Sequence, residues 1–142
     1  MNWMLCKIKY DKITETGVQR TVTEPYLVDA LSFTEAEARI IEEMKPFISG
    51  EFTVSAISRY KVAETLLNES GDRYYRSRLE YITLDEKSGN EKKQGVFFLV
   101  QAYTIEEARN IIETEMKKTM IDYNIVKIEE TKIMDVFPYS KQ

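Results

Sequence analysis

The sequence predicts an α+β protein built from two tandem ββαβ repeats, with antiparallel sheets covered by two helices and a pseudo-twofold axis relating the copies. Three observations predict it: an internal repeat, alternating apolar segments at matching positions, and one amphipathic helix in each copy. The chain has 142 residues, of which 43% are hydrophobic, and a domain of this length buries roughly 70% of its unfolded surface. We place the repeats at residues 1–71 and 72–142 and expect them to pack as one globular unit.

The internal repeat is the strongest of these signals. At an offset of 72 residues, LVDALSFTEAEARIIEEM (27–44) aligns with LVQAYTIEEARNIIETEM (99–116) without a gap, and eight of the eighteen positions are identical. The match extends at an offset of 71 to Tyr10 with Tyr81 and to Lys61 with Lys132. A long period that occurs only twice indicates a duplicated domain, because a solenoid needs at least three repeats.

Each copy begins with a predicted hairpin. Apolar and more polar residues alternate over 4–10 in the first copy and over 75–81 in the second, as is typical of a half-buried strand. A polar turn containing Gly17 or Gly89 then leads into a second apolar segment. Two strands joined by such a turn predict a β-hairpin.

A helix follows each hairpin. Ser32 and Thr104 are good N-caps, and Glu35 and Glu107 stand three residues later in the capping-box position. Apolar residues at helical spacing form one stripe in each copy, which predicts that each helix covers a sheet.

The end of each copy is predicted to return to β structure. A third strand is expected at about 52–58 and 124–129, and β-rich segments at 60–67 and 131–137 are candidates for a short fourth strand.

Composition excludes several classes of function. The chain has no histidine, the usual base of Ser and Cys triads, and Cys6 is its only cysteine. A thiolate zinc site within one chain would lack its other sulfur ligands. The glutamates on the helices are interpreted as solvated faces. We therefore expect no catalytic residue, no metal site, no cofactor and no enzymatic activity.

The sequence also indicates a location. Its apolar runs are far shorter than the roughly 20 residues of a membrane helix, and it starts with an alternating strand pattern in place of a secretory leader. A cytoplasmic protein without membrane association is expected.

A basic and aromatic segment is the best local candidate for binding. It suits phosphate contacts interleaved with base stacking, although the net charge of −4 means that any nucleic-acid role depends on a local patch. The alternative interpretation of this segment is a strand face that is merely exposed to solvent, and the hairpin lysines can equally protect a sheet edge. The candidate nucleic-acid residues are Arg73, Tyr74, Tyr75, Arg76, Arg78, Lys92 and Lys93.

The C-terminal run is a second candidate, here for a protein partner. Asp135, Phe137 and Tyr139 belong to an apolar tail that either docks on a partner or pairs as a strand within its own sheet. Nine tyrosines and six phenylalanines exceed what two small cores need, so a homo-oligomer is expected.

The segments EPYLVDALSFTEAEARIIEEM, SGEF, GDRYY, LDEKSG and MDVFPY together resemble an uncharacterised domain-of-unknown-function family of small bacterial and bacteriophage proteins. The resemblance spans nearly the whole chain and supplies no catalytic residue, cofactor or substrate. It implies only an association with DNA handling or with interference with host systems.

Three functions are consistent with these observations. The first is a non-enzymatic accessory protein that binds single-stranded DNA or RNA, and it is slightly favoured. The second is a protein-interaction module or structural homo-oligomer that engages a host or replication partner. The third, an enzyme using carboxylates or lysine, is disfavoured because the sequence contains no recognisable site.

Overall fold

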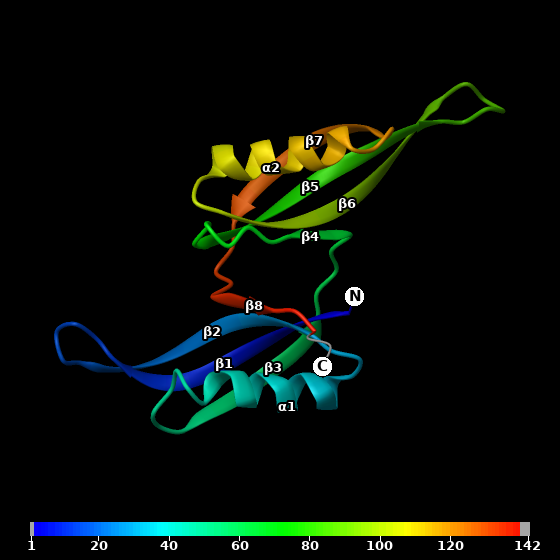
Figure 1. The fold of residues 1–142 in the computed structure, drawn as a ribbon. Coiled ribbons are helices and arrows are strands. Elements are labelled where there is room, and N and C mark those ends of the chain that lie inside the picture. Colours follow the sequence, from blue (N-terminus) through cyan, green and yellow to red (C-terminus); the bar gives the residue numbers. More distant parts are fainter. Residues whose placement is uncertain (1, 140–142) are drawn as a thin grey trace. The chain divides into compact units, whose positions relative to one another are not determined.

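A computed structural model describes residues 2–139 and confirms the α+β class (Figure 1). The chain forms two compact units, one containing residues up to Tyr60 together with the segment from Lys132 onward, the other Lys61–Thr131. Each unit is a four-stranded sheet with one helix packed on it. Neither helix, at 12 and 13 residues, is long or apolar enough to cross a membrane.

The first unit has the strand order β3-β1-β2-β8. The predicted hairpin is β1 and β2, which pair antiparallel along their full length, and β3 pairs with the other side of β1. The short strand β8 pairs with β2 and runs parallel to it. Its elements are β1 (Trp3–Ile13), β2 (Gln19–Asp29), α1 (Phe33–Met44), β3 (Phe52–Arg59) and β8 (Asp135–Phe137).

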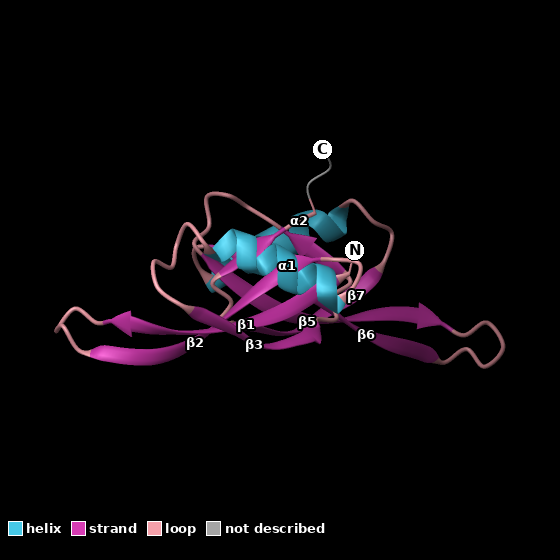
Figure 2. Ribbon diagram, turned by 90° about the horizontal axis from the view of Figure 1, so that it is seen from below, coloured by secondary structure: helices cyan, strands magenta, loops and turns pink. Residues whose placement is uncertain are grey.

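The second unit repeats this plan with the order β4-β6-β5-β7. Strand β5 is central, antiparallel to β6 on one side and to β7 on the other, and the short β4 runs parallel to β6. In both units the long hairpin runs on beyond the helix (Figure 2). Its elements are β4 (Glu64–Leu66), β5 (Arg73–Leu84), β6 (Glu91–Ala102), α2 (Ile105–Lys117) and β7 (Asp122–Glu130).

The short fourth strands exist at the predicted positions, but each belongs to the sheet of the other repeat. Strand β4 follows β3 of the first repeat and pairs with β6, whereas β8 follows β7 of the second repeat and pairs with β2. The compact units therefore differ from the predicted division at 71/72: residues 61–71 lie with the second repeat, and 132–139 lie with the first. Strands β2 and β6 each have one side that β1 or β5 leaves open, and this side receives the last strand of the other repeat.

Both predicted helix caps are present. The Glu35 N–H donates to Ser32 Oγ and the Glu107 N–H to Thr104 Oγ1, each at 3.1 Å. The two glutamates differ in their own contacts: Glu107 Oε1 accepts from the N–H of Tyr103, the residue before the N-cap, at 3.1 Å, whereas Glu35 Oε1 is buried with no hydrogen-bond partner among the described residues.

Each core lies between a helix and one face of a sheet. Three helix residues at matching positions are buried in each copy, Ala36, Ile40 and Met44 in α1 and Ala108, Ile112 and Met116 in α2. They pack on alternate residues of the central strand, such as Met4 and Cys6 in β1. A bulge interrupts both central pairings at equivalent positions, between Lys7 and Ile8 and between Arg78 and Leu79.

Candidate ligand-binding surface

The candidate surface is the face of the second sheet that α2 does not cover, called here the helix-free face. Tyr75 and Leu79 of β5 belong to the core under the helix, so the alternate residues Arg76 and Arg78 lie on the opposite face. The strand register adds residues from the neighbouring strands that stand directly opposite these positions. The helix-free face thus collects side chains from β5, β6 and β7.

The two predicted stacking aromatics are not available at this surface. Tyr75 is 3% exposed and packs in the core under α2. Tyr74 lies on the other face, as the alternation predicts, but it is 6% exposed. A strand pattern assigns a side chain to a face and does not show whether that face is covered.

Arg73, at the start of β5, is exposed and lies close to two carboxylates. Its guanidinium lies 3.6 Å from a carboxylate oxygen of Glu130 and 4.0 Å from one of Asp72. A hydrogen bond with Tyr75, followed by the attraction of Glu130, raises the pKa of Arg73 above its ordinary value. Arg73 also shares the alternation of Tyr75 and so does not belong to the helix-free face.

Arg76 and Arg78 lie on the helix-free face. The half-buried Arg76 lies over the ring of Phe97, with its guanidinium carbon 3.9 Å from the ring centroid. The exposed Arg78 stands directly opposite Phe97 on one side and Lys127 on the other. Lys127 is exposed and pairs with Glu129 at 3.1 Å.

The two hairpin lysines divide between the faces. Lys93 is opposite Ile82, which shares the alternation of Arg78, so Lys93 extends the helix-free face along the hairpin. Lys92 is opposite Thr83 and points to the other side. Of the seven predicted residues, the structure thus brings together Arg76, Arg78 and Lys93 as exposed or half-buried cations.

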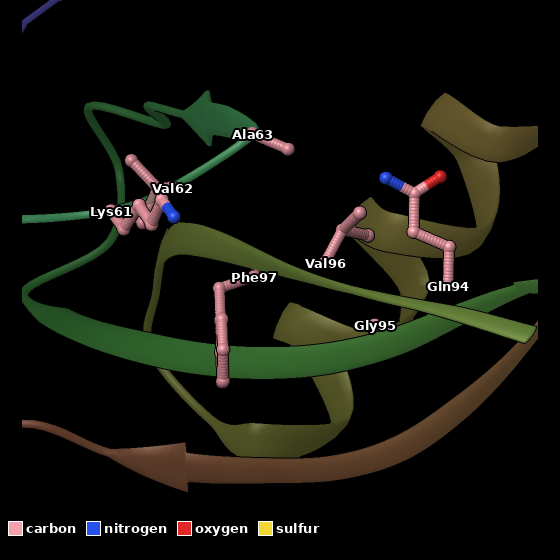
Figure 3. Close-up of a pocket in the computed structure, with 7 residues that line it drawn as sticks. All are labelled: Lys61, Val62, Ala63, Gln94, Gly95, Val96 and Phe97. Carbon is pink, nitrogen blue, oxygen red and sulfur yellow. The ribbon is translucent and has the colours of Figure 1, made fainter.

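A groove borders this surface along the outer edge of β6 (Figure 3). Its volume is ≈ 460 Å³, and part of its wall is the segment that leads into β4. Most of its lining is apolar, with one lysine and one glutamine. The lining residues are Lys61, Val62, Ala63, Gln94, Gly95, Val96 and Phe97.

The sequence did not point to Lys127, Phe97 or Lys61 as parts of a site. Lys127 joins Arg78 only through the β5–β7 register, and Lys61 reaches the second unit only because the repeats exchange their last strands. The repeat alignment did carry one usable signal, since Phe97 aligns with Pro25 at the offset of 72. Replacement of an edge proline by an aromatic residue marks a difference between the two sheet edges.

The predicted tail residues lie within the first unit. Phe137 is in β8 and stacks on Tyr26 at 6.1 Å between ring centroids. Asp135 begins β8 opposite Tyr26, and Tyr139 is exposed beneath the guanidinium of Arg39. The tail pairs as a strand in a sheet of its own chain, and docking of these residues on a partner stays a prediction, as does self-association.

Among residues 2–139, no three carboxylate, thiol or imidazole side chains gather closely enough to hold a metal ion. The fold and the surface together define a two-unit α+β protein of duplicated repeats, with cations on the helix-free face of its second sheet and a groove along the adjoining edge. The chain belongs to the family described as a domain of unknown function, DUF4494, whose model matches residues 2–139. Comparisons with curated proteins and with solved structures give no match.

Proposed function

We propose that this protein binds single-stranded nucleic acid on the helix-free face of its second unit and catalyses no reaction. The proposed contacts are Arg76, Arg78 and Lys93 from the sequence prediction, joined by Lys127 through the strand register. Phe97, under Arg76, supplies an aromatic surface on the same face. Exposed cations beside an aromatic ring suit a flexible strand, whose phosphates and bases are both accessible.

The observation that carries this proposal is the like-charged pair Arg78 and Lys127. Their Cα positions are directly opposite on adjacent strands, an arrangement in which like charges repel, and the ion pair of Lys127 with Glu129 offsets part of this repulsion. The equivalent pair in the first unit is Lys7 and Ala56, which carries one charge. A phosphate between Arg78 and Lys127 would remove the repulsion.

Acidic residues limit the strength of the proposed interaction. Glu129 is paired with Lys127, and Glu80 shares the alternation of Arg78 along β5. Two or three phosphate contacts therefore describe the surface better than a long basic track. For single strands, a plot of the logarithm of affinity against the logarithm of salt concentration should then have a slope of roughly −1.4 to −2.1, about −0.7 for each contact.

Fluorescence anisotropy with a labelled oligothymidylate, titrated at several salt concentrations, tests the proposal. Replacing Arg78→Ala together with Lys127→Ala should lower affinity about tenfold or more and flatten the salt slope by about 1.4, since each lost contact removes about 0.7. The matched control is Lys7→Ala with Lys9→Ala, which removes two exposed cations from the equivalent strand of the first unit. No binding at low salt, or an equal loss in the control, contradicts the proposal.

A further inference from the structure

The outer edge of β6 is only partly occupied. Strand β4 pairs with it over Phe98–Val100, and the Ala63 N–H donates to the Phe97 carbonyl at 2.7 Å. Toward its start at Glu91, β6 continues along the hairpin, and no strand within residues 2–139 pairs with it on this side. The edge therefore remains open over several residues beyond the last bond to the β4 segment.

The backbone groups along this open stretch face outward. The N–H and C=O of one strand residue point to the same side, and this side alternates along the strand. Because the Phe97 carbonyl meets the β4 segment, the backbone groups of Gly95 and Lys93 are directed to the same outer edge. Such groups are a ready template for an added strand.

The corresponding edge of the first unit is protected. The residue equivalent to Phe97 is Pro25, whose carbonyl accepts from the Met134 N–H at 2.9 Å as Phe97 accepts from Ala63. Proline has no N–H and is a common means of blocking strand addition at an edge. The second repeat lacks this proline, and it carries Gly95 where the first carries Thr23.

The groove beside this edge offers space and charge for a partner strand. Val62 and Val96 supply apolar lining, and Lys61 is exposed on the opposite wall. The absence of a side chain at Gly95 leaves room for Arg78, since a Cβ there would lie 3.2 Å from a guanidinium nitrogen.

Three cations lie on or beside the rim of the groove, together with the exposed Glu64 that follows Ala63. Lys61, Arg78 and Lys93 are exposed, and the acid directly opposite Gly95 is the half-buried Glu80 of β5. An added strand with carboxylates would complement this rim.

We infer that this edge binds an extended, acidic segment of a partner protein, which adds to the second sheet in line with β4. Main-chain hydrogen bonds to Gly95 and Lys93 hold the segment, and an apolar side chain enters the groove between Val62 and Val96. Carboxylates on the alternate residues meet Lys61 and Lys93. Affinity then comes from the backbone, and selectivity from the groove and its cations.

The test is selection of a phage-displayed library of random octapeptides on the full chain. We expect enrichment of peptides that lack proline and alternate apolar residues with Asp or Glu. A fluorescein-labelled enriched peptide should lose at least tenfold in affinity to Gly95→Pro, which removes the N–H and places a ring at the edge. The matched control, Thr23→Pro at the equivalent position of β2, should bind the peptide unchanged.

A second variant avoids any change to the backbone. Lys61→Glu combined with Lys93→Glu reverses the charge of the rim and should also lower peptide affinity at least tenfold, with circular dichroism confirming an unchanged fold. Enrichment of basic peptides, or of peptides indifferent to Gly95→Pro, overturns the inference.

A further variant distinguishes a failure of this inference from a failure of the nucleic-acid proposal. Gly95→Pro adds a Cβ 3.2 Å from the Arg78 guanidinium and so can also disturb nucleic-acid binding. Lys61→Ala removes a cation of the groove and leaves Arg78 and Lys127 unchanged, so it should weaken binding of an enriched peptide and change oligothymidylate affinity less than twofold. An oligothymidylate that loses affinity in this variant, with no peptide enriched, assigns the edge to nucleic acid and overturns the inference.

Discussion

Cys6 shows how a single buried group links the fold to pH. It lies in β1 with no exposed surface, packed in the core under α1. Burial raises the pKa of its thiol from an ordinary value of 9.0 to about 11. The native thiol is therefore protonated and shielded at neutral pH, which makes it unreactive.

The raised pKa predicts a loss of stability in alkali. Below pH 9 the thiol is protonated in both states, so its contribution is fully present there. Between pH 9 and about 11 only the unfolded chain releases the proton, so the free energy of unfolding falls. Urea titrations at pH 8 and 10.5 should show a smaller difference for Cys6→Ala than for the unchanged chain. An equal fall in both proteins contradicts this role of Cys6.

At the residue scale the sequence predicts faces better than exposure. The alternation in β5 separates Tyr74 from Tyr75 correctly, yet both rings are buried. Exposure depends on what covers each face, which local periodicity does not encode. The sequence likewise did not show which residue of β7 stands opposite Arg78, because the β-bulge shifts the register by one residue.

Helix starts and strand positions were predicted correctly where the sequence signal lies within a few consecutive residues. The N-caps of both helices follow from three or four consecutive residues, and their hydrogen bonds are present. The short strands β4 and β8 were located, but their partners were not, since three residues contain too little pattern to select a sheet edge.

The helix caps predict a measurable difference between the two copies. Ser32→Ala and Thr104→Ala should each lower the free energy of unfolding by about 1 kcal/mol. Glu107→Ala should cost more than Glu35→Ala, because only Glu107 accepts the Tyr103 N–H and a bond from the Asn68 amide. Urea midpoints of the four variants check this order. Equal losses at Glu35 and Glu107 would show that the extra bonds contribute nothing.

Strand β8 should stabilise the first unit and not the second. Val136 is 7% exposed in β8 opposite Leu27, so Val136→Asp buries a charge and should destabilise this pairing by about 2 kcal/mol or more. Amide hydrogen exchange should accelerate in β2, while β6 is unaffected. Thr65→Asp, the equivalent change in β4, is the matched control and should act on β6. Acceleration in both sheets from Val136→Asp contradicts the assignment.

At the scale of the whole molecule, the repeats depend on each other for their fourth strands. Each repeat supplies the short fourth strand of the other repeat's sheet. The open edge of its own sheet is in turn filled by the short strand of the other repeat. The repeat alignment could not predict this exchange. The sequence pattern is the same whether each short strand pairs within the sheet of its own repeat or within that of the other repeat. The pseudo-twofold axis between the copies stays a prediction.

Cutting the chain between the repeats tests the exchange. A protease site inserted between Glu69 and Ser70, in an exposed turn, avoids Gly71, where a Cβ would lie 2.5 Å from Ala102. After cleavage the two halves should stay together on gel filtration, since each holds a strand of the other sheet. Halves that separate without denaturant contradict the exchange.

The most direct test of the functional account is a titration of the ¹⁵N-labelled full chain with an oligothymidylate at low salt, followed by NMR. The account predicts shifts of the backbone amides of Arg76, Arg78 and Lys127, which lie on adjacent strands of the second sheet. The equivalent first-unit residues Leu5, Lys7 and Ala56 should not respond. Shifts confined to the first unit, or no shifts at a saturating concentration, contradict the proposed binding surface.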